Sequence, residues 1–397
     1  MYYLSQILSK VLIAIGIAVV TPILSHAQLN WQFKPFQSVG YSSNILLSPS
    51  VLAVGSSDTM GRSEIYKKDF YNKIGFGNRL EKQSDNGNVF GVNTNVQTQN
   101  FASVKLADTY MIRNVADYKF KVDTDFTFIP RIGIEKTKKL TIDILTDDGV
   151  NTYDYWYYFG GSEGFYRVNK RLRIGADFEC GWKTYKTMVS GRNFTHMQYL
   201  ASVEAEYWLN KINFFNFGYA FKQYDFKSLQ SEFSPNTLID WQYHSVFASA
   251  KYKIDNDHYM SFTTELERKS DFNKADFSFS QWNNKLVWDW YFKRIGIYGD
   301  LQANFRNYKR RMAYTEESSM DDYLFLKYNY YTANFKLKYN WNANSMIYAG
   351  YSRELRETNS TRIEKKYRRS FEFFGFSIGW TYTFNKEFSK APPVTNL

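Results

Sequence analysis

The sequence contains almost no cysteine and little proline. Cys180 is the one cysteine in 397 residues, so no disulfide can form within the chain. Only 7 prolines occur, which leaves long stretches free for strands, because proline removes a hydrogen bond from a β-ladder. We therefore expect a fold that is held together by backbone hydrogen bonding and side-chain packing.

Long hydrophobic runs are also scarce. Beyond residue 28 no segment approaches about 18 consecutive apolar residues, and the mean hydropathy is negative, which excludes a helical inner-membrane protein. The one apolar run, Val11 to Leu24, follows a lysine and precedes the small residue Ala27. This order predicts a secretory signal peptide at residues 1–27. A transmembrane helix is the alternative, but the run is short for a bilayer and contains Pro22.

Aromatic residues and positive charge are abundant instead. Aromatics make up 19% of the chain, with 33 Tyr and 34 Phe, and such residues suit pleated strands and membrane–water interfaces. The net charge is +11, and it becomes +10 when the signal peptide is removed with its single lysine. We expect an exported chain of this charge to meet anionic lipid headgroups and lipopolysaccharide, and not nucleic acid.

Apolar and polar residues alternate with a period of two from about Phe70 onward. In residues 171–183 one face carries Leu172, Ile174, Ala176, Phe178, Cys180 and Trp182, and the other carries Arg171, Arg173, Asp177, Glu179 and Lys183. The segments 197–209 and 295–306 repeat the pattern. This period predicts β-strands and excludes amphipathic helices.

The breaks between these segments distinguish a soluble β-sandwich from a barrel. Short breaks, such as Asn210-Lys211 and Asn342-Ala343, alternate with long ones, such as 227–239 and 310–323. Alternation of tight turns and long loops is typical of an outer-membrane up-and-down antiparallel β-barrel, with the tight turns and both termini in the periplasm. We predict sixteen strands, with fourteen as the alternative, near 31–43, 68–81, 88–101, 116–127, 131–143, 153–168, 171–186, 196–209, 212–226, 240–254, 258–270, 278–292, 295–309, 325–340, 345–357 and 368–384.

The last predicted strand has the clearest two-faced pattern. Glycine, serine and threonine alternate with an apolar face that includes Phe374, Phe376, Trp380, Tyr382 and Phe384. This strand is therefore expected to close the barrel, with one face toward lipid and the other toward the lumen. The predicted barrel spans residues 28–384, and residues 385–397 are expected to form an unstructured periplasmic tail.

Two features resemble known barrel families. The closing strand, which ends in the aromatic Phe384, is similar to the strand that the barrel assembly machinery reads in outer-membrane barrels, although here a tail follows it. The opening segment Gly40-Tyr41-Ser42-Ser43-Asn44-Ile45, together with the Tyr- and Asn-rich strands, resembles Bacteroidota-type porin-like barrels and barrels that export surface lipoproteins. These resemblances imply an outer-membrane location in a Gram-negative bacterium and name no activity.

The polar and ionisable residues of the chain give little support for catalysis. Three histidines remain after the signal peptide: His196 near the outer rim, His244 in the outer half of its strand and His258 near a periplasmic turn. A hydrolase needs a nucleophile, a base and an orienting partner close together, and no Gly-x-Ser-x-Gly elbow is present. We expect no enzyme, no cofactor and no metal. Asp147-Asp148-Gly149 is best interpreted as a solvated turn, and Cys180 as a residue that packs against lipid.

Charged residues on the polar faces are the candidate functional residues. We predict that they line the lumen, where opposite charges neutralise one another and keep the interior hydrated. The lumen-lining candidates are Arg171, Arg173, Asp177, Glu179, Glu204, Glu206, Lys251, Lys253, Glu265, Glu267, Asp300, Arg306, Lys336 and Lys338. Residues 44–66 are long enough to fold inward and constrict such a pore.

A basic cluster precedes the last strand: Arg362, Lys365, Lys366, Arg368 and Arg369. It either binds lipopolysaccharide phosphates or anionic solutes, or belongs to a pair of loops that neutralise each other.

The sequence favours a porin-like channel for small hydrophilic solutes. The alternative is a plugged barrel that assists a protein partner in secretion, surface lipoprotein delivery or envelope assembly, and an enzyme or adhesin ranks last.

Overall fold

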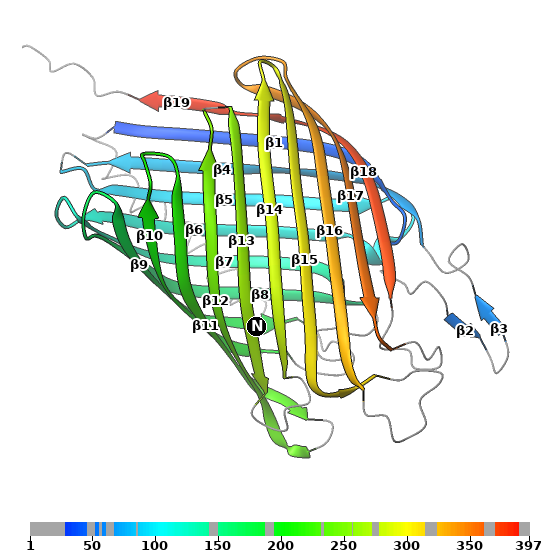
Figure 1. Cartoon of the computed structure of the whole chain (residues 1–397). Helices are drawn as coiled ribbons and strands as arrows, with labels where there is room; N and C mark the ends of the chain where they lie inside the picture. Colours follow the sequence, from blue (N-terminus) through cyan, green and yellow to red (C-terminus); the bar gives the residue numbers. More distant parts are fainter. Residues whose placement is uncertain are drawn as a thin grey trace, which may run out of the picture.

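Sixteen antiparallel strands form one closed barrel (Figure 1). The computed structural model describes residues 28–45, 52–54, 58–60, 67–84, 86–142, 150–186, 194–231, 234–255, 257–271, 278–313, 324–360 and 370–388. The barrel strands are β1 (Gln28–Ser42), β4 (Asp69–Gln83), β5 (Val89–Phe101), β6 (Thr109–Lys121), β7 (Phe126–Ile142), β8 (Val150–Arg167), β9 (Leu172–Tyr185), β10 (His196–Trp208), β11 (Phe214–Ser231), β12 (Ser234–Lys253), β13 (His258–Asp271), β14 (Phe279–Phe292), β15 (Ile295–Met312), β16 (Phe325–Asn340), β17 (Ser345–Thr358) and β18 (Phe371–Tyr382), which β19 (Phe384–Phe388) continues.

Each strand pairs with its neighbour in sequence, and β1 closes the ring. On one side β1 pairs with β4, and on the other with β18 and β19. The register is unbroken across the last two, since Phe36 lies opposite Thr381 and Phe33 opposite Phe384. β18 and β19 are therefore one strand of the barrel. The predicted sixteen-strand barrel is confirmed, and the fourteen-strand alternative is wrong.

The observed strands differ from the expected ones at several boundaries. β6 begins at Thr109 and not near residue 116, because the Asp69 carboxylate accepts the N–H groups of Ser103 and Val104 and so holds a compact loop that contains the 3₁₀ helix η1 (Lys105–Ala107). The turn between β6 and β7 lies at residues 122–125 and not at 128–130. The loop expected at 227–239 is largely strand, with β11 and β12 continuing into a hairpin. Residues 385–388 of the expected tail belong to β19, which pairs with β1, and residues 389–397 lie outside the described residues.

The short turns share one local hydrogen-bond pattern. In the turns after β8, β10 and β12, the side-chain oxygens of Asn169, Asn210 and Asp255 each accept two backbone N–H groups two and three residues further on. This Asx turn reverses the chain tightly, which is why these sites carry Asn or Asp. At Asp255, the N–H of Asp257 and then the His258 side chain hold the pKa of the carboxyl below its ordinary value.

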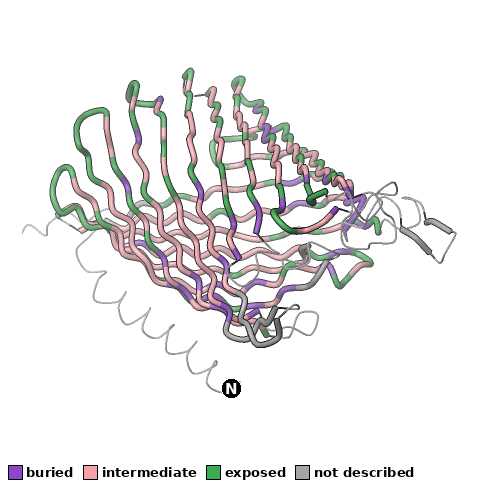
Figure 2. The backbone as a smooth tube through the Cα atoms, turned by 60° about the horizontal axis from the view of Figure 1, so that its bottom comes forward, coloured by how far each residue is buried: buried purple, intermediate pink, exposed green. Residues whose placement is uncertain are grey.

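The barrel wall has two faces of opposite character. Large apolar side chains on one face are freely exposed, among them Val203, Phe217, Val246 and Leu266 at 53 to 63%. Figure 2 shows the strands of the wall mostly half-buried, with many of the exposed residues at the turns. The other face is polar. We call the apolar face the outer face and the polar face the inner face.

The polar face is the concave one, because its side chains bridge strands that are not adjacent. Arg131 on β7 reaches Asp177 on β9 at 2.8 Å, and Lys338 on β16 reaches Asp289 on β14 at 2.8 Å. Side chains of strands two apart converge inside a closed sheet and diverge outside it. Among the described residues, no helix is long and apolar enough to cross a membrane.

A small hairpin of β2 (Leu52–Val54) and β3 (Asp58–Met60) is a separate two-stranded sheet, which Figure 1 draws beyond the end of the barrel. Residues 46–51, 55–57 and 61–66 around it lie outside the described residues. Constriction of the pore by residues 44–66 therefore stays a prediction.

Candidate functional site: the barrel interior

The strands place thirteen of the fourteen lumen-lining candidates on the inner face. These thirteen are Arg173, Asp177, Glu179, Glu204, Glu206, Lys251, Lys253, Glu265, Glu267, Asp300, Arg306, Lys336 and Lys338. Arg171 instead lies in the turn before β9, where its carbonyl accepts the Trp208 N–H and its side chain is exposed.

A charged network crosses β8 on the inner face. The Arg131 guanidinium lies 2.8 Å from Asp177 and 3.3 Å from Glu179. The Tyr157 hydroxyl donates to the second oxygen of Glu179 at 2.7 Å. One arginine, two carboxylates and one phenol from three strands thus satisfy one another, which lowers the cost of removing their charges from bulk water.

A second network crosses β5 and requires a glycine beneath it. Arg79 on β4 contacts Glu81 at 2.7 Å and Asp117 on β6 at 3.3 Å. A Cβ atom at Gly91, on the strand between them, would lie 2.8 Å from the Arg79 guanidinium and 2.9 Å from the Asp117 carboxylate. Glycine at this position therefore leaves room for the pair.

Charged side chains of the inner face remain open to solvent, both in the middle of the barrel and near the short turns. Lys285, which pairs with Asp300 at 3.2 Å, is 45% exposed, and Arg173, which pairs with Glu206, is 38% exposed. Lys222 is also 38% exposed beside Glu267. Solvent thus reaches these groups, and the described segments leave space in the interior at their level.

Two lysines on the inner face form no ion pair among the described residues. They are Lys73 on β4 and Lys336 on β16. The Lys336 ammonium lies 5.3 Å from the centre of the Tyr348 ring. Lys336 was a sequence candidate and Lys73 was missed, although the alternation of β4 could have indicated its face.

Aromatic clusters with stacked cations cover the inner face toward the long-loop end. Phe194, Phe226 and Trp241 form one cluster with β8 tyrosines, and Tyr328 belongs to another. The Lys269 ammonium lies 3.3 Å from the centre of the Trp241 ring and is 4% exposed. Sequence reasoning missed these clusters, which make this end of the inner face more aromatic than the middle.

The three histidines lie in different environments. His196 is buried, with Nδ1 2.7 Å from the Phe194 carbonyl oxygen, whereas His258 contacts Asp255 at 2.9 Å in a short turn. His244 lies on the outer face with Nδ1 2.6 Å from the Tyr219 hydroxyl. The described strands bring none of them together, and they contain no cluster of three or more side chains that could hold a metal ion. Cys180 is a half-buried free thiol on the outer face.

The predicted signal peptide at residues 1–27 lies outside the described residues, and so do two candidate sites. One is the turn at Asp147-Asp148-Gly149. The other is the basic cluster of Arg362, Lys365, Lys366, Arg368 and Arg369.

Comparisons with known proteins find resemblance at the level of solved structures alone. No family model matches the chain, and no curated protein matches its sequence. OccAB4 of Acinetobacter baumannii is 8% identical, covering 92% of this chain and 100% of its own, with a TM-score of 0.47. Outer-membrane expressed OmpT of Vibrio cholerae is 9% identical, covering 91% and 99%, with a TM-score of 0.45. CdiB from Acinetobacter baumannii is 7% identical with a TM-score of 0.45, and this chain covers 60% of its length.

Proposed function

We propose that the chain is an outer-membrane β-barrel of a Gram-negative bacterium whose interior is a water-filled passage for small hydrophilic solutes. The observation that carries the proposal is the two-faced wall, with exposed apolar side chains outside and solvated ion pairs inside. Water-soluble proteins rarely expose contiguous apolar patches larger than a few hundred Å². In a lipid bilayer, exposed apolar side chains contact hydrocarbon and not water, so their exposure is not unfavourable. A closed barrel also leaves no unpaired strand edge in the bilayer.

Aromatic residues at the short-turn end support the same placement. Tyr252, Trp290, Phe292, Tyr339 and Trp341 are between 36 and 63% exposed near the ends of their strands or in the turns. Amphipathic rings of this kind gather at membrane–water interfaces. With tight turns on the periplasmic side, both ends of the barrel chain would also face the periplasm.

The free cations favour anionic solutes. Lys73 and Lys336 lie on the inner face and form no ion pair among the described residues, whereas Lys285 pairs with Asp300 and Lys338 with Asp289. A cation that no carboxylate neutralises attracts anions that enter the interior. We therefore assign the passage a preference for anions.

A sealed barrel that serves a protein partner is the second candidate. The buried rings of Phe194, Trp241 and Tyr328 favour it, because they cover the inner face toward the long-loop end. Ion currents through purified barrels in planar bilayers separate the two candidates. Stepwise currents with a chloride preference support the passage, whereas silent insertion, verified by protease protection, refutes it and favours the sealed barrel.

A further inference from the structure

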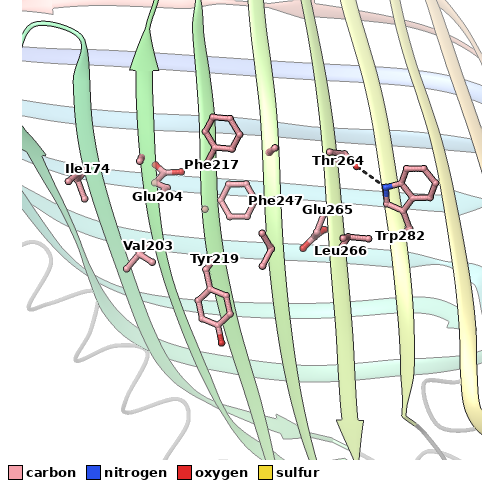
Figure 3. A pocket seen from close by; sticks show the side chains of 14 residues that line it. Ile174, Val203, Glu204, Phe217, Tyr219, Phe247, Thr264, Glu265, Leu266 and Trp282 are labelled. Carbon is pink, nitrogen blue, oxygen red and sulfur yellow. Dashed lines mark hydrogen bonds between the residues drawn. The ribbon is translucent and has the colours of Figure 1, made fainter.

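The outer face carries a polar row directly beside two apolar recesses. The first recess, of about 870 Å³, spans β9 to β14, where small residues such as Ala205 and Ala248 lie among Phe217, Leu266 and Trp282 (Figure 3). The second, of about 500 Å³, spans β13 to β17 and is lined by apolar residues that include Leu301 and Tyr331. Both are hollows in the part of the wall that the proposed function places in lipid.

The polar row crosses five strands at directly paired positions. His244, Arg268, Ser280, Asn307 and Lys327 follow one another across the ladders from β12 to β16. Their strands alternate so that all five belong to the outer face, and Arg268, Ser280, Asn307 and Lys327 are exposed. Arg268 is two residues from Leu266, and Ser280 two residues from Trp282, so the row borders the first recess on its long-loop side.

The two cations in the row differ from Arg353, an outer-face cation at the border of the second recess that pairs with Glu372 at 2.8 Å. Among the described residues, neither Arg268 nor Lys327 forms an ion pair. Two outer-face carboxylates lie near the row. Asp240 on β12 stands four residues before His244, about 13 Å along the strand, and Glu357 on β17 is diagonal to Lys327, because it pairs with Asn329. An unpaired arginine beside lipid is costly, unless an anion at the membrane surface neutralises it.

We propose that this surface binds one phosphorylated glycolipid of the lipopolysaccharide type, with acyl chains in the two recesses and phosphates on the polar row. Arg268 and Lys327 are three ladder steps apart, about 14 Å, so they can hold two separate phosphates. Between them Ser280 and Asn307 offer hydrogen-bond donors to the sugar or phosphate oxygens.

The row lies on the long-loop side, which is the outer leaflet if the tight turns are periplasmic. The inference therefore rests on the proposed function. It assigns a ligand to the outside of the wall, independently of what passes through the interior.

Native mass spectrometry of the full barrel in mild detergent tests the proposal. The probes are bisphosphorylated lipid A, its monophosphorylated form and phosphatidylglycerol. We expect one bisphosphorylated lipid per barrel, bound about tenfold more weakly after Arg268→Gln or Lys327→Gln, because each loses a charge-assisted contact. Lys136→Gln is the matched control, because Lys136 lies on the outer face of β7, lines neither recess and pairs with Asp154. It should leave the affinity within about twofold.

Ala248→Phe fills the first recess without touching the polar row, and it should also weaken binding about tenfold. The gel mobility of unheated samples verifies that each variant is folded. Equal affinity for phosphatidylglycerol, or wild-type affinity in Arg268→Gln, overturns the proposal. So does a dimer that Ala248→Phe dissociates without any change in lipid binding, since a second copy would then occupy the recess.

The two proposals fail in different ways. A chain that folds as a monomer without detergent refutes both the membrane barrel and the lipid site. A detergent-dependent barrel that retains no glycolipid refutes the lipid site alone.

Discussion

An arginine at position 203 should destabilise the barrel far more than one at position 202. Val203 is 53% exposed on the outer face of β10, five residues before the strand ends at Trp208. At about 3.3 Å per residue and a tilt of about 45°, it lies about 12 Å above the short-turn end, near the middle of an apolar band about 25 Å tall. Arginine at such a depth costs about 2–4 kcal/mol.

Ser202→Arg is the matched control on the same strand. Ser202 faces the interior and lies directly opposite Asp177, so a new arginine there finds both water and a carboxylate. We expect a change of about 1 kcal/mol or less. Both variants carry the same added charge and differ by one step along the chain.

Urea unfolding of the barrel in phospholipid vesicles, followed by fluorescence of its 10 tryptophans, measures both values. If Val203→Arg stays within about 0.5 kcal/mol of wild type, as an exposed substitution does in a soluble protein, the assignment of faces is refuted. It is equally refuted if Ser202→Arg is the more costly of the two.

Three further predictions concern the interior, the closure and a turn. Lys73→Glu and Lys336→Glu should each lower the chloride-to-potassium permeability ratio, measured as a shift of the reversal potential in a salt gradient. An unchanged ratio contradicts the anion preference. Arg353→Gln on the outer face is the control. A chain ending at Thr383 loses the pairing of β19 with Leu29–Phe33 and the contact between the Trp31 and Phe384 rings, whose centres are 5.1 Å apart. Its free energy of unfolding should therefore fall by about 3 kcal/mol or more, whereas a chain ending at Phe388 should match wild type. Equal stability of the two truncated chains would argue against β19 as part of the closing strand. Asp255→Ala should lower the midpoint of urea unfolding further than Asp255→Asn, because asparagine keeps an acceptor for the two turn N–H groups and loses only the charge interaction with His258. Equal midpoints for the two variants would show that this turn does not need the two hydrogen bonds.

The sequence predicts much of this barrel, because the local alternation of apolar and polar residues determines where a strand lies and which side chains point outward. The faces of Arg173 and Cys180 follow directly from a period of two, and closure requires only that the ends meet. The beginning of β6 was missed because the Asp69 carboxylate, about 34 residues earlier, organises the loop before it. β19 was missed because Asn385 and Lys386 look like the start of a tail, although they pair with β1.

Contacts between strands that are not neighbours could not be predicted. The curvature of the closed sheet decides which inner-face side chains converge, and no local pattern encodes it. The bridges from Arg131 to Asp177 and from Lys338 to Asp289 are of this kind. The polar row from His244 to Lys327 likewise depends on five registers at once, and each is fixed by turn geometry and packing along the whole hairpin.

Cys180 provides the most direct test of the two-faced wall, because it is the only cysteine and lies on the outer face of β9. A nitroxide attached there in vesicle-reconstituted barrels can be relaxed by oxygen, which partitions into lipid, or by a water-soluble nickel chelate. The account predicts strong relaxation by oxygen and little by the chelate, with the reverse for a nitroxide at the inner-face position of Glu179 in a cysteine-free background. Strong relaxation by the chelate at Cys180 would contradict it.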